Sequence, residues 1–156
     1  MKQAIFINTP LGRIGIAGRE EGITNIFFGK TVQPGGYVEE ETPVLKEAAT
    51  QLQAYFAGEL RTFTVPVLTE GTAFQKQVWQ ALTEIPYGQV RSYGQLSQGI
   101  FGKTNAARAV GHANARNPIS IIVPCHRVIG ASGVLTGYAG GLAAKELLLK
   151  LEGAIV

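Results

Sequence analysis

SYGQLSQGIFGKTNAARAVGHANA, residues 92–115, decides the fold of the C-terminal half of this chain. Ser92 is a preferred N-cap residue and predicts a short helix over Tyr93–Gly99. Thr104 or Asn105 is expected to cap a second helix, over Ala106–Ala115. A short helix, a turn and a second short helix together predict a helix-turn-helix.

The second of these helices is unusual because nearly all of its side chains are small. Val110 is its only bulky apolar residue. Small side chains let a helix backbone approach another surface closely, and that surface is either a neighbouring helix or the groove of a DNA duplex. Arg108 and His112 are four residues apart and therefore share one face. An arginine among alanines is suited to probe a duplex, so both interpretations stay open.

The N-terminal half shows a different pattern. Ala4–Ile7, Arg13–Ala17 and Ile23–Phe28 read as strands separated by turn residues, which predicts an antiparallel meander. Residues 31–41 read as a loop. Thr42-Pro43 then begins a helix that Gly58 ends, because a cap followed by proline at the first position is a common helix start.

Predicted strands in the first half and predicted helices in the second half indicate an α+β chain of two domains. A boundary near Leu68–Gly71 separates a small sheet-plus-helix domain, residues 1–69, from a mostly helical domain, residues 70–156. Thr72 is expected to cap a helix that runs through Ile85, and a last helix is expected from about Gly141 to Leu151.

Composition excludes several classes of protein. No apolar run approaches the roughly 20 residues that span a membrane, and the N-terminus lacks the apolar region of a signal peptide. A single cysteine cannot form an internal disulfide, so we expect a reducing, cytoplasmic setting. The chain has no Asp, two His and one Cys, and it lacks zinc-site spacings and a phosphate loop.

Charge is distributed unevenly along the chain. Residues 1–69 hold six Lys/Arg and seven Glu, whereas residues 70–156 hold eight Lys/Arg and four Glu. No acidic residue occurs between Ile85 and Lys145. Such a basic region suits a polyanion such as nucleic acid, or it is a moderately basic surface without a ligand.

The only cysteine lies in IIVPCHRVIG, residues 121–130. The apolar residues before it favour a small buried hydrophobe. Pro124 interrupts regular strand pairing, and the possible charges of His126 and Arg127 favour a reactive thiol. If the segment is extended, Cys125 and His126 point to opposite sides, so their contact needs a bent backbone or a bridging water.

Glu152 is placed against the usual preference at the end of its predicted helix, where the macrodipole disfavours an anion. One interpretation is an exposed, slightly unfavourable glutamate. The other is a carboxylate that orients a histidine, because no Asp is available for that task.

PCHRV at 124–128 resembles the active-site motif of the O6-alkylguanine-DNA alkyltransferases, also called methylated-DNA–protein-cysteine methyltransferases. Family blocks follow in the same order, from about Phe74 to Gly153, whereas the first 70 residues match only in general form. The resemblance implies a ribonuclease-H-like N-terminal domain and a C-terminal domain with a winged-helix-like helix-turn-helix. The supporting blocks are IPYGQVRSYGQL (85–96), AARAVG (106–111), NP (117–118), GYAGGL (137–142) and KELLLKLEG (145–153).

The resemblance also implies roles for single residues. Cys125 would accept the alkyl group, and His126 would act as its base through a water. Glu152 would polarise His126, Asn117 would brace the active-site turn, and Tyr93 would donate a hydrogen bond to the target base.

Arg108 would enter the duplex from the minor groove and fill the space of the extruded nucleotide. Other implied DNA contacts are Ser92, Tyr93, Thr104, Ala106, Ala107, Ala109 and Gly111. The implied base pocket comprises Tyr93, Cys125, Val128, Tyr138 and Ala139, where some relatives carry Ser at the position of Ala139.

The implied reaction is a single-turnover DNA repair. An alkyl group would move from O6-alkylguanine in double-stranded DNA to Cys125, with no cofactor and no metal, and with the protein as a monomer away from membranes. Two rival functions are a helix-turn-helix protein that binds alkylated DNA without repairing it, and a cysteine hydrolase, which would need His112 beside Cys125.

Overall fold

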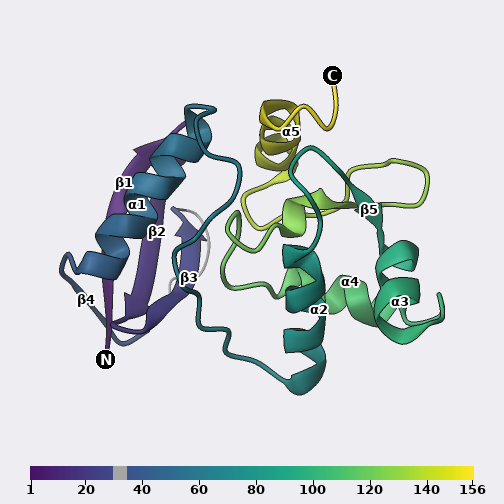
Figure 1. The fold of residues 1–156 in the computed structure, drawn as a ribbon, viewed down its shortest axis with the longest axis horizontal. Helices are drawn as coiled ribbons and strands as arrows, with labels where there is room; N and C mark the ends of the chain where they lie inside the picture. Colours follow the sequence, from purple (N-terminus) through teal and green to yellow (C-terminus); the bar gives the residue numbers. More distant parts are fainter. Residues whose placement is uncertain (30–34) are drawn as a thin grey trace. The chain divides into compact units, whose positions relative to one another are not determined.

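The chain divides between Glu70 and Gly71 into two units, and the computed structural model describes residues 1–29 and 35–156 (Figure 1). The first unit combines a sheet with one helix, and the second is mostly helices and long loops. The α+β class is therefore confirmed. No helix in the described ranges has the length and apolar character that crossing a bilayer requires.

The sheet of the first unit has the strand order β3-β2-β1-β4. The first three strands are antiparallel neighbours, which confirms the predicted meander. A fourth strand pairs in parallel with β1, so the prediction of a loop over 31–41 is wrong there, and residues 30–34 lie outside the described residues. The strands are β1 (Lys2–Thr9), β2 (Gly12–Arg19), β3 (Gly22–Phe28) and β4 (Tyr37–Glu39).

Strand β4 has only three residues, too few to show the alternating pattern of a strand. Contacts with other strands stabilise it. The ring of Tyr37 lies 6.4 Å from that of Phe6 and 6.2 Å from that of Phe27. These aromatic contacts join β4 to the neighbouring strand β1 and to β3.

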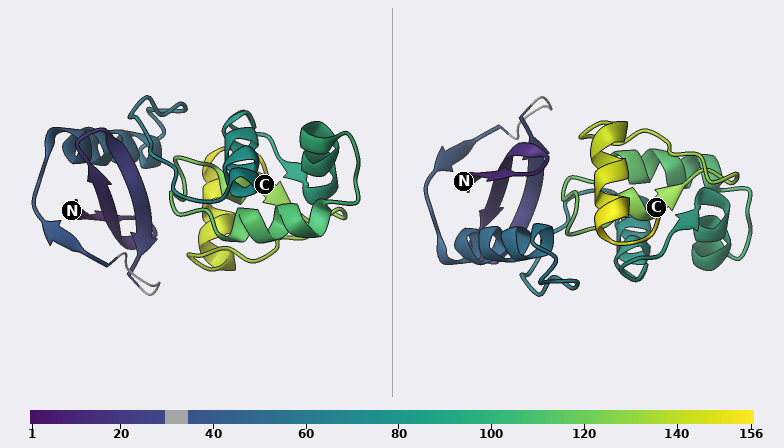
Figure 2. Two further views of the ribbon diagram at one scale, coloured as in Figure 1. Left: turned by 90° about the horizontal axis from the view of Figure 1, so that it is seen from below. Right: turned by 90° about the horizontal axis from the view of Figure 1, so that it is seen from above.

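One helix, α1 (Pro43–Phe56), covers one face of this sheet (Figures 1 and 2). Its start is as predicted, because the Thr42 hydroxyl accepts a hydrogen bond from the Leu45 amide and proline occupies the first turn. The side chains of Leu45, Leu52 and Tyr55 are completely buried against the strands.

The second unit begins with α2 (Ala73–Thr83), which Thr72 and Gln75 start as a capping box. It ends two residues before the predicted Ile85. Trp79 on this helix is buried, and its indole Nε1 donates a 2.8 Å hydrogen bond to the Ala113 carbonyl. That bond holds α2 against the second helix of the helix-turn-helix.

The helix-turn-helix consists of α3 (Tyr93–Phe101) and α4 (Ala107–Ala115). Ser92 caps α3 as predicted, but the helix runs two residues further than expected, to a left-handed Gly102 with φ of 72°. The prediction that Thr104 or Asn105 caps α4 is wrong, since Ala106 occupies the N-cap position and has no side-chain cap.

A buried serine of α3 braces the turn before α4. The Ser97 hydroxyl accepts a hydrogen bond from the Ala106 amide at 3.2 Å and donates one to the Lys103 carbonyl at 2.5 Å. Both partners precede the first turn of α4, so Ser97 fixes the N-cap residue and does not cap the amides of that turn.

The chain beyond α4 brings the cysteine segment beside the start of α3. A 3-10 turn, η1 (Cys125–Arg127), leads into β6 (Val128–Ile129). Strand β6 pairs in parallel with β5 (Arg91–Ser92), which immediately precedes Tyr93. The chain then reaches α5 (Leu142–Leu151), whose end packs beside η1 (Figure 1).

Candidate active site

A tight turn between α4 and η1 positions the cysteine. Asn117 spans this turn, because its Nδ2 donates to the Val123 carbonyl at 2.8 Å and its Oδ1 accepts from the Ile119 amide at 3.0 Å. Ile121 within the turn has a φ of 75°, a left-handed conformation that is costly for a β-branched residue. The segment is therefore bent, not extended, before it reaches Cys125.

Cys125 is the first residue of η1 and is only 5% exposed. Burial raises the pKa of its thiol, because a thiolate is poorly solvated there. Hydrogen bonding by the Asn117 and Ser120 side chains and the charge of Lys145 lower the same pKa to a smaller extent. The thiol is therefore protonated at rest near neutral pH, and a nucleophilic step requires a base.

His126 follows Cys125 in η1 and pairs with Glu152. Its Nε2 lies 2.7 Å from Glu152 Oε2, and both side chains are buried. Burial lowers the pKa of His126, although the hydrogen bond to Glu152 acts in the opposite direction. The neutral ring donates from Nε2 to the carboxylate and keeps Nδ1 as an acceptor. That Nδ1 is buried and has no hydrogen-bond partner among the described residues.

Arg127 completes the polar cluster, a role that the sequence pattern did not reveal. Its Nε and Nη2 donate to the two oxygens of Glu152 at 2.8 and 3.0 Å, and its Nη1 donates to the Ile85 carbonyl at 2.7 Å. This two-pronged ion pair offsets the charge of Glu152 at the end of α5. Glu152 is thus a buried, clamped carboxylate, not an exposed one.

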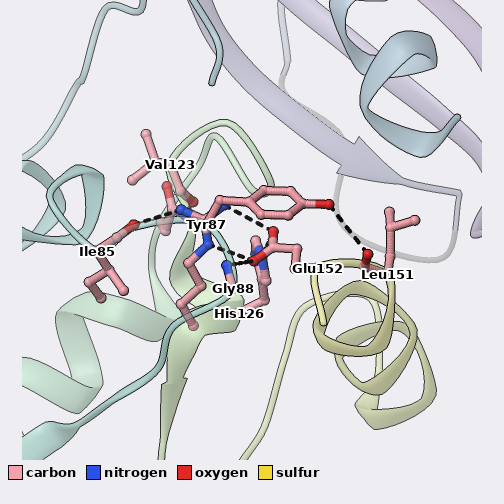
Figure 3. Close-up of polar contacts among 9 residues, drawn as sticks. Ile85, Tyr87, Gly88, Val123, His126, Leu151 and Glu152 are labelled. Carbon is pink, nitrogen blue, oxygen red and sulfur yellow. Dashed lines mark hydrogen bonds and ion pairs between the residues drawn. The ribbon is translucent and has the colours of Figure 1, made fainter. Parts of the chain in front are cut away.

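Backbone contacts fix the carboxylate further. The loop that follows α2 lies over the end of α5, where the Gly88 amide approaches Glu152 Oε1 at 3.5 Å (Figure 3). The Tyr87 hydroxyl in the same loop donates to the Leu151 carbonyl at 3.3 Å (Figure 3). The loop Pro86-Tyr87-Gly88 therefore helps to build the site.

A second polar cluster surrounds Tyr93. The Tyr93 hydroxyl is hydrogen-bonded to the Thr136 hydroxyl. Lys145 of α5, which is completely buried, donates to the Val128 carbonyl at 2.6 Å and lies 3.3 Å from both the carbonyl and the hydroxyl oxygen of Thr136. Sequence reasoning missed Lys145 and Thr136, because neither belongs to a local chemical motif.

Helix α4 presents a basic outer face. Arg108 and His112 are exposed, and both line two hollows that flank the helix. One of these hollows also includes Tyr93 and Gly111, where an added Cβ would lie 3.6 Å from the tyrosine ring. A small residue at Gly111 therefore keeps the ring of Tyr93 close to the helix.

The small residues of α4 lie on both its buried face and its exposed face. Val110, Ala113 and Asn114 point inward, and the Ala113 carbonyl receives the hydrogen bond from Trp79. Ala109 and Ala115 are exposed, as is Thr104 in the turn. Helix α4 therefore packs closely against α2 with its inner face. Its outer face stays exposed to solvent.

The structure gathers the predicted site residues into two groups. Cys125, His126, Glu152 and Asn117 form one, and Tyr93 lies with α4 in the other. The hollow beside Tyr93 does not include the cysteine among its lining residues. Pairing of β5 with β6 connects the two groups through adjacent backbone.

The remaining pocket residues differ in their burial. Val128 is buried, and its carbonyl is occupied by Lys145. Tyr138 is half-buried, with its ring edge-on to that of His126 at 6.5 Å. Ala139 is exposed.

These features define a class: a protein with a helix-turn-helix unit that contains a buried cysteine beside a neutral histidine and a clamped glutamate. Sequence profiles of protein families agree with this class. Residues 4–69 match the 6-O-methylguanine DNA methyltransferase, ribonuclease-like domain, and residues 73–154 match the 6-O-methylguanine DNA methyltransferase, DNA binding domain. The chain belongs to the 6-O-methylguanine DNA methyltransferase family.

Individual relatives support the same membership. A methylated-DNA–protein-cysteine methyltransferase of Methanosarcina acetivorans is 56% identical, with 99% of each chain covered. One of Mycobacterium leprae is 51% identical over 94% of this chain and 89% of its own. The crystal structure of Mycobacterium tuberculosis OGT in complex with DNA has a TM-score of 0.91 at 48% identity, covering 97% of this chain and 93% of that one.

Proposed function

We propose that this protein repairs DNA by transferring the alkyl group of O6-alkylguanine to Cys125 in a single turnover. The observation that carries the proposal is the buried His126–Glu152 pair next to the only cysteine of the chain. The names of the relatives, which specify methylated DNA and a protein cysteine, support this substrate and this acceptor.

The transfer begins with loss of the thiol proton. His126 Nδ1, turned away from Glu152, receives this proton through a water, and the carboxylate stabilises the resulting imidazolium. The thiolate then attacks the alkyl carbon, so that a carbon–sulfur bond forms while the bond to guanine O6 breaks.

The leaving base takes the electron pair of the broken bond and acquires a proton, so that the thiol proton is replaced overall by the alkyl group. Tyr93 donates a hydrogen bond to the departing guanine and favours its neutral form. The product on Cys125 is a thioether, which water does not hydrolyse. Each protein molecule therefore reacts once.

The target nucleotide must leave the base stack before it can reach a buried thiol. Extrusion costs a few kcal/mol, and Arg108 on the exposed face of α4 lowers this cost by filling the vacated space from the minor groove. Ser92, Thr104 and the small residues of α4 border the same contact. Residues 70–156 act as the DNA-binding and acceptor domain in this proposal, and one copy of the chain suffices.

The decisive experiment is an intact mass measurement. The protein is incubated with a duplex oligonucleotide that contains one O6-methylguanine, and with matched duplexes containing O4-methylthymine or only undamaged bases. A gain of one methyl group, mapped to Cys125 by peptide analysis, is the expected result for O6-methylguanine.

The same measurement separates the rival functions. Tight binding without a mass change would instead indicate a damage-binding protein. A cysteine hydrolase would need a second histidine near the thiol, but His112 lies on the exposed face of α4 and lines hollows that do not include Cys125.

A further inference from the structure

The buried Lys145 and the hydroxyl of Thr136 form a polar chain that ends on Tyr93. Lys145 can only donate hydrogen bonds, and its three acceptors are the Val128 carbonyl, the Thr136 carbonyl and the Thr136 hydroxyl oxygen. The Thr136 hydroxyl in turn contacts the hydroxyl of Tyr93. The three side chains come from α5, the loop before it and the first turn of α3.

The inventory of donors allows a relay of hydrogen bonds that runs from Lys145 through Thr136 to Tyr93. A threonine hydroxyl has one proton and two acceptor sites. When Lys145 donates to Thr136 Oγ1, the proton of Thr136 remains available for the oxygen of Tyr93. Tyr93 is then free to donate its own proton to a third group.

We propose that Thr136, supported by Lys145, is a positioning residue that polarises the Tyr93 hydroxyl toward the departing guanine. The inference rests on the proposed function, in which Tyr93 donates to the base. Successive donors in a chain strengthen one another, particularly where burial excludes water. The hydrogen bond from Tyr93 is therefore stronger in the transition state, where negative charge develops on the base, than the same bond from an isolated phenol.

Thr136→Val is the central test, because valine keeps the branched shape of the side chain and replaces its hydroxyl with a methyl group. The contact between Lys145 and Val128 does not depend on that hydroxyl. The rate constant of methyl transfer at saturating duplex is expected to fall about tenfold, the effect of one hydrogen bond that acts mainly in the transition state. Affinity for the methylated duplex is expected to stay unchanged, which a purely structural defect would not produce.

Thr136→Ser retains the hydroxyl and is expected to restore most of the rate. Thr50→Val, an exposed threonine on α1, is the matched control and is expected to react like the wild type. If Thr136→Val does not fold, Thr136→Ala removes the same hydroxyl with less steric demand.

A double-mutant cycle with Tyr93→Phe gives the sharpest discrimination. If Thr136 acts through Tyr93, adding Thr136→Val to Tyr93→Phe changes the rate by less than about twofold. Losses that multiply, or a Thr136→Val rate equal to that of the wild type, would overturn the inference while methylation of wild-type Cys125 still supports the proposed function. Failure of the wild type to gain a methyl group would overturn both.

Discussion

His126 Nε2 and Glu152 Oε2 lie 2.7 Å apart, although 26 positions separate the two residues in the sequence. The contact places a carboxylate behind a neutral imidazole whose other nitrogen is left to accept a proton. Arg127 donates to both oxygens of the same carboxylate. One buried glutamate therefore pairs with the histidine and neutralises a buried guanidinium.

Glu152→Gln should destabilise the fold because it leaves Arg127 buried without an anion. Loss of one partner from a buried ion pair lowers the free energy of unfolding by about 3–5 kcal/mol. Urea unfolding measures this change. Glu146→Gln is the matched control on the same helix, since its exposed pair with Lys150 contributes only about 0.5 kcal/mol. Similar losses in the two variants would contradict the clamped geometry.

Stability should fall with acid through the titration of His126. Burial holds the folded-state pKa of His126 below its ordinary value of 6.5, so the unfolded chain takes up a proton first. This contribution is fully present above pH 6.5 and is lost as the pH falls from there through the folded-state pKa. Urea unfolding at a series of pH values should show it.

One histidine variant isolates this effect. His126→Gln should flatten the dependence of stability on pH below 6.5, because it removes the group whose pKa burial lowers. An unaltered profile in this variant would assign the titration to another group.

Cys125→Ala should abolish transfer and leave DNA binding largely intact. The thiol is buried, and the basic outer face of α4 carries the proposed contacts with the duplex. Intact mass measures transfer from an O6-methylguanine duplex, and a gel shift with the same duplex measures DNA binding. Removal of the lesion by the alanine variant would rule out Cys125 as the acceptor.

Arg108→Ala should slow repair of duplex DNA much more than reaction with free O6-benzylguanine, because only the duplex requires extrusion of a nucleotide. Arg116→Ala is the control, since it removes another exposed positive charge, at the C-cap of the same helix. That variant should weaken duplex binding and reduce its dependence on salt without a selective loss of transfer. Equal losses of Arg108→Ala in both reactions would argue against insertion into the duplex.

Local sequence patterns predicted most of the secondary structure for a physical reason. Helix caps act within about three residues, as in the capping boxes at Thr72 and Ser92, and strand signals act over a few alternating side chains. The secondary-structure prediction was wrong where a residue distant in the sequence made the deciding contact. Ser97 of α3 fixes the residue before α4, where a local cap was expected, and aromatic packing accompanies the conversion of part of a predicted loop into β4.

Three features can be read from local sequence: a histidine follows the cysteine, Glu152 is unfavourably placed at the end of its helix, and a basic helix of small residues follows a turn. Folding brings Arg127 onto this glutamate and links Lys145 to Tyr93 through Thr136. These contacts join segments that are distant in the sequence, so they depend on how those segments pack, which no local pattern specifies. Burial strengthens the Arg127–Glu152 contact further.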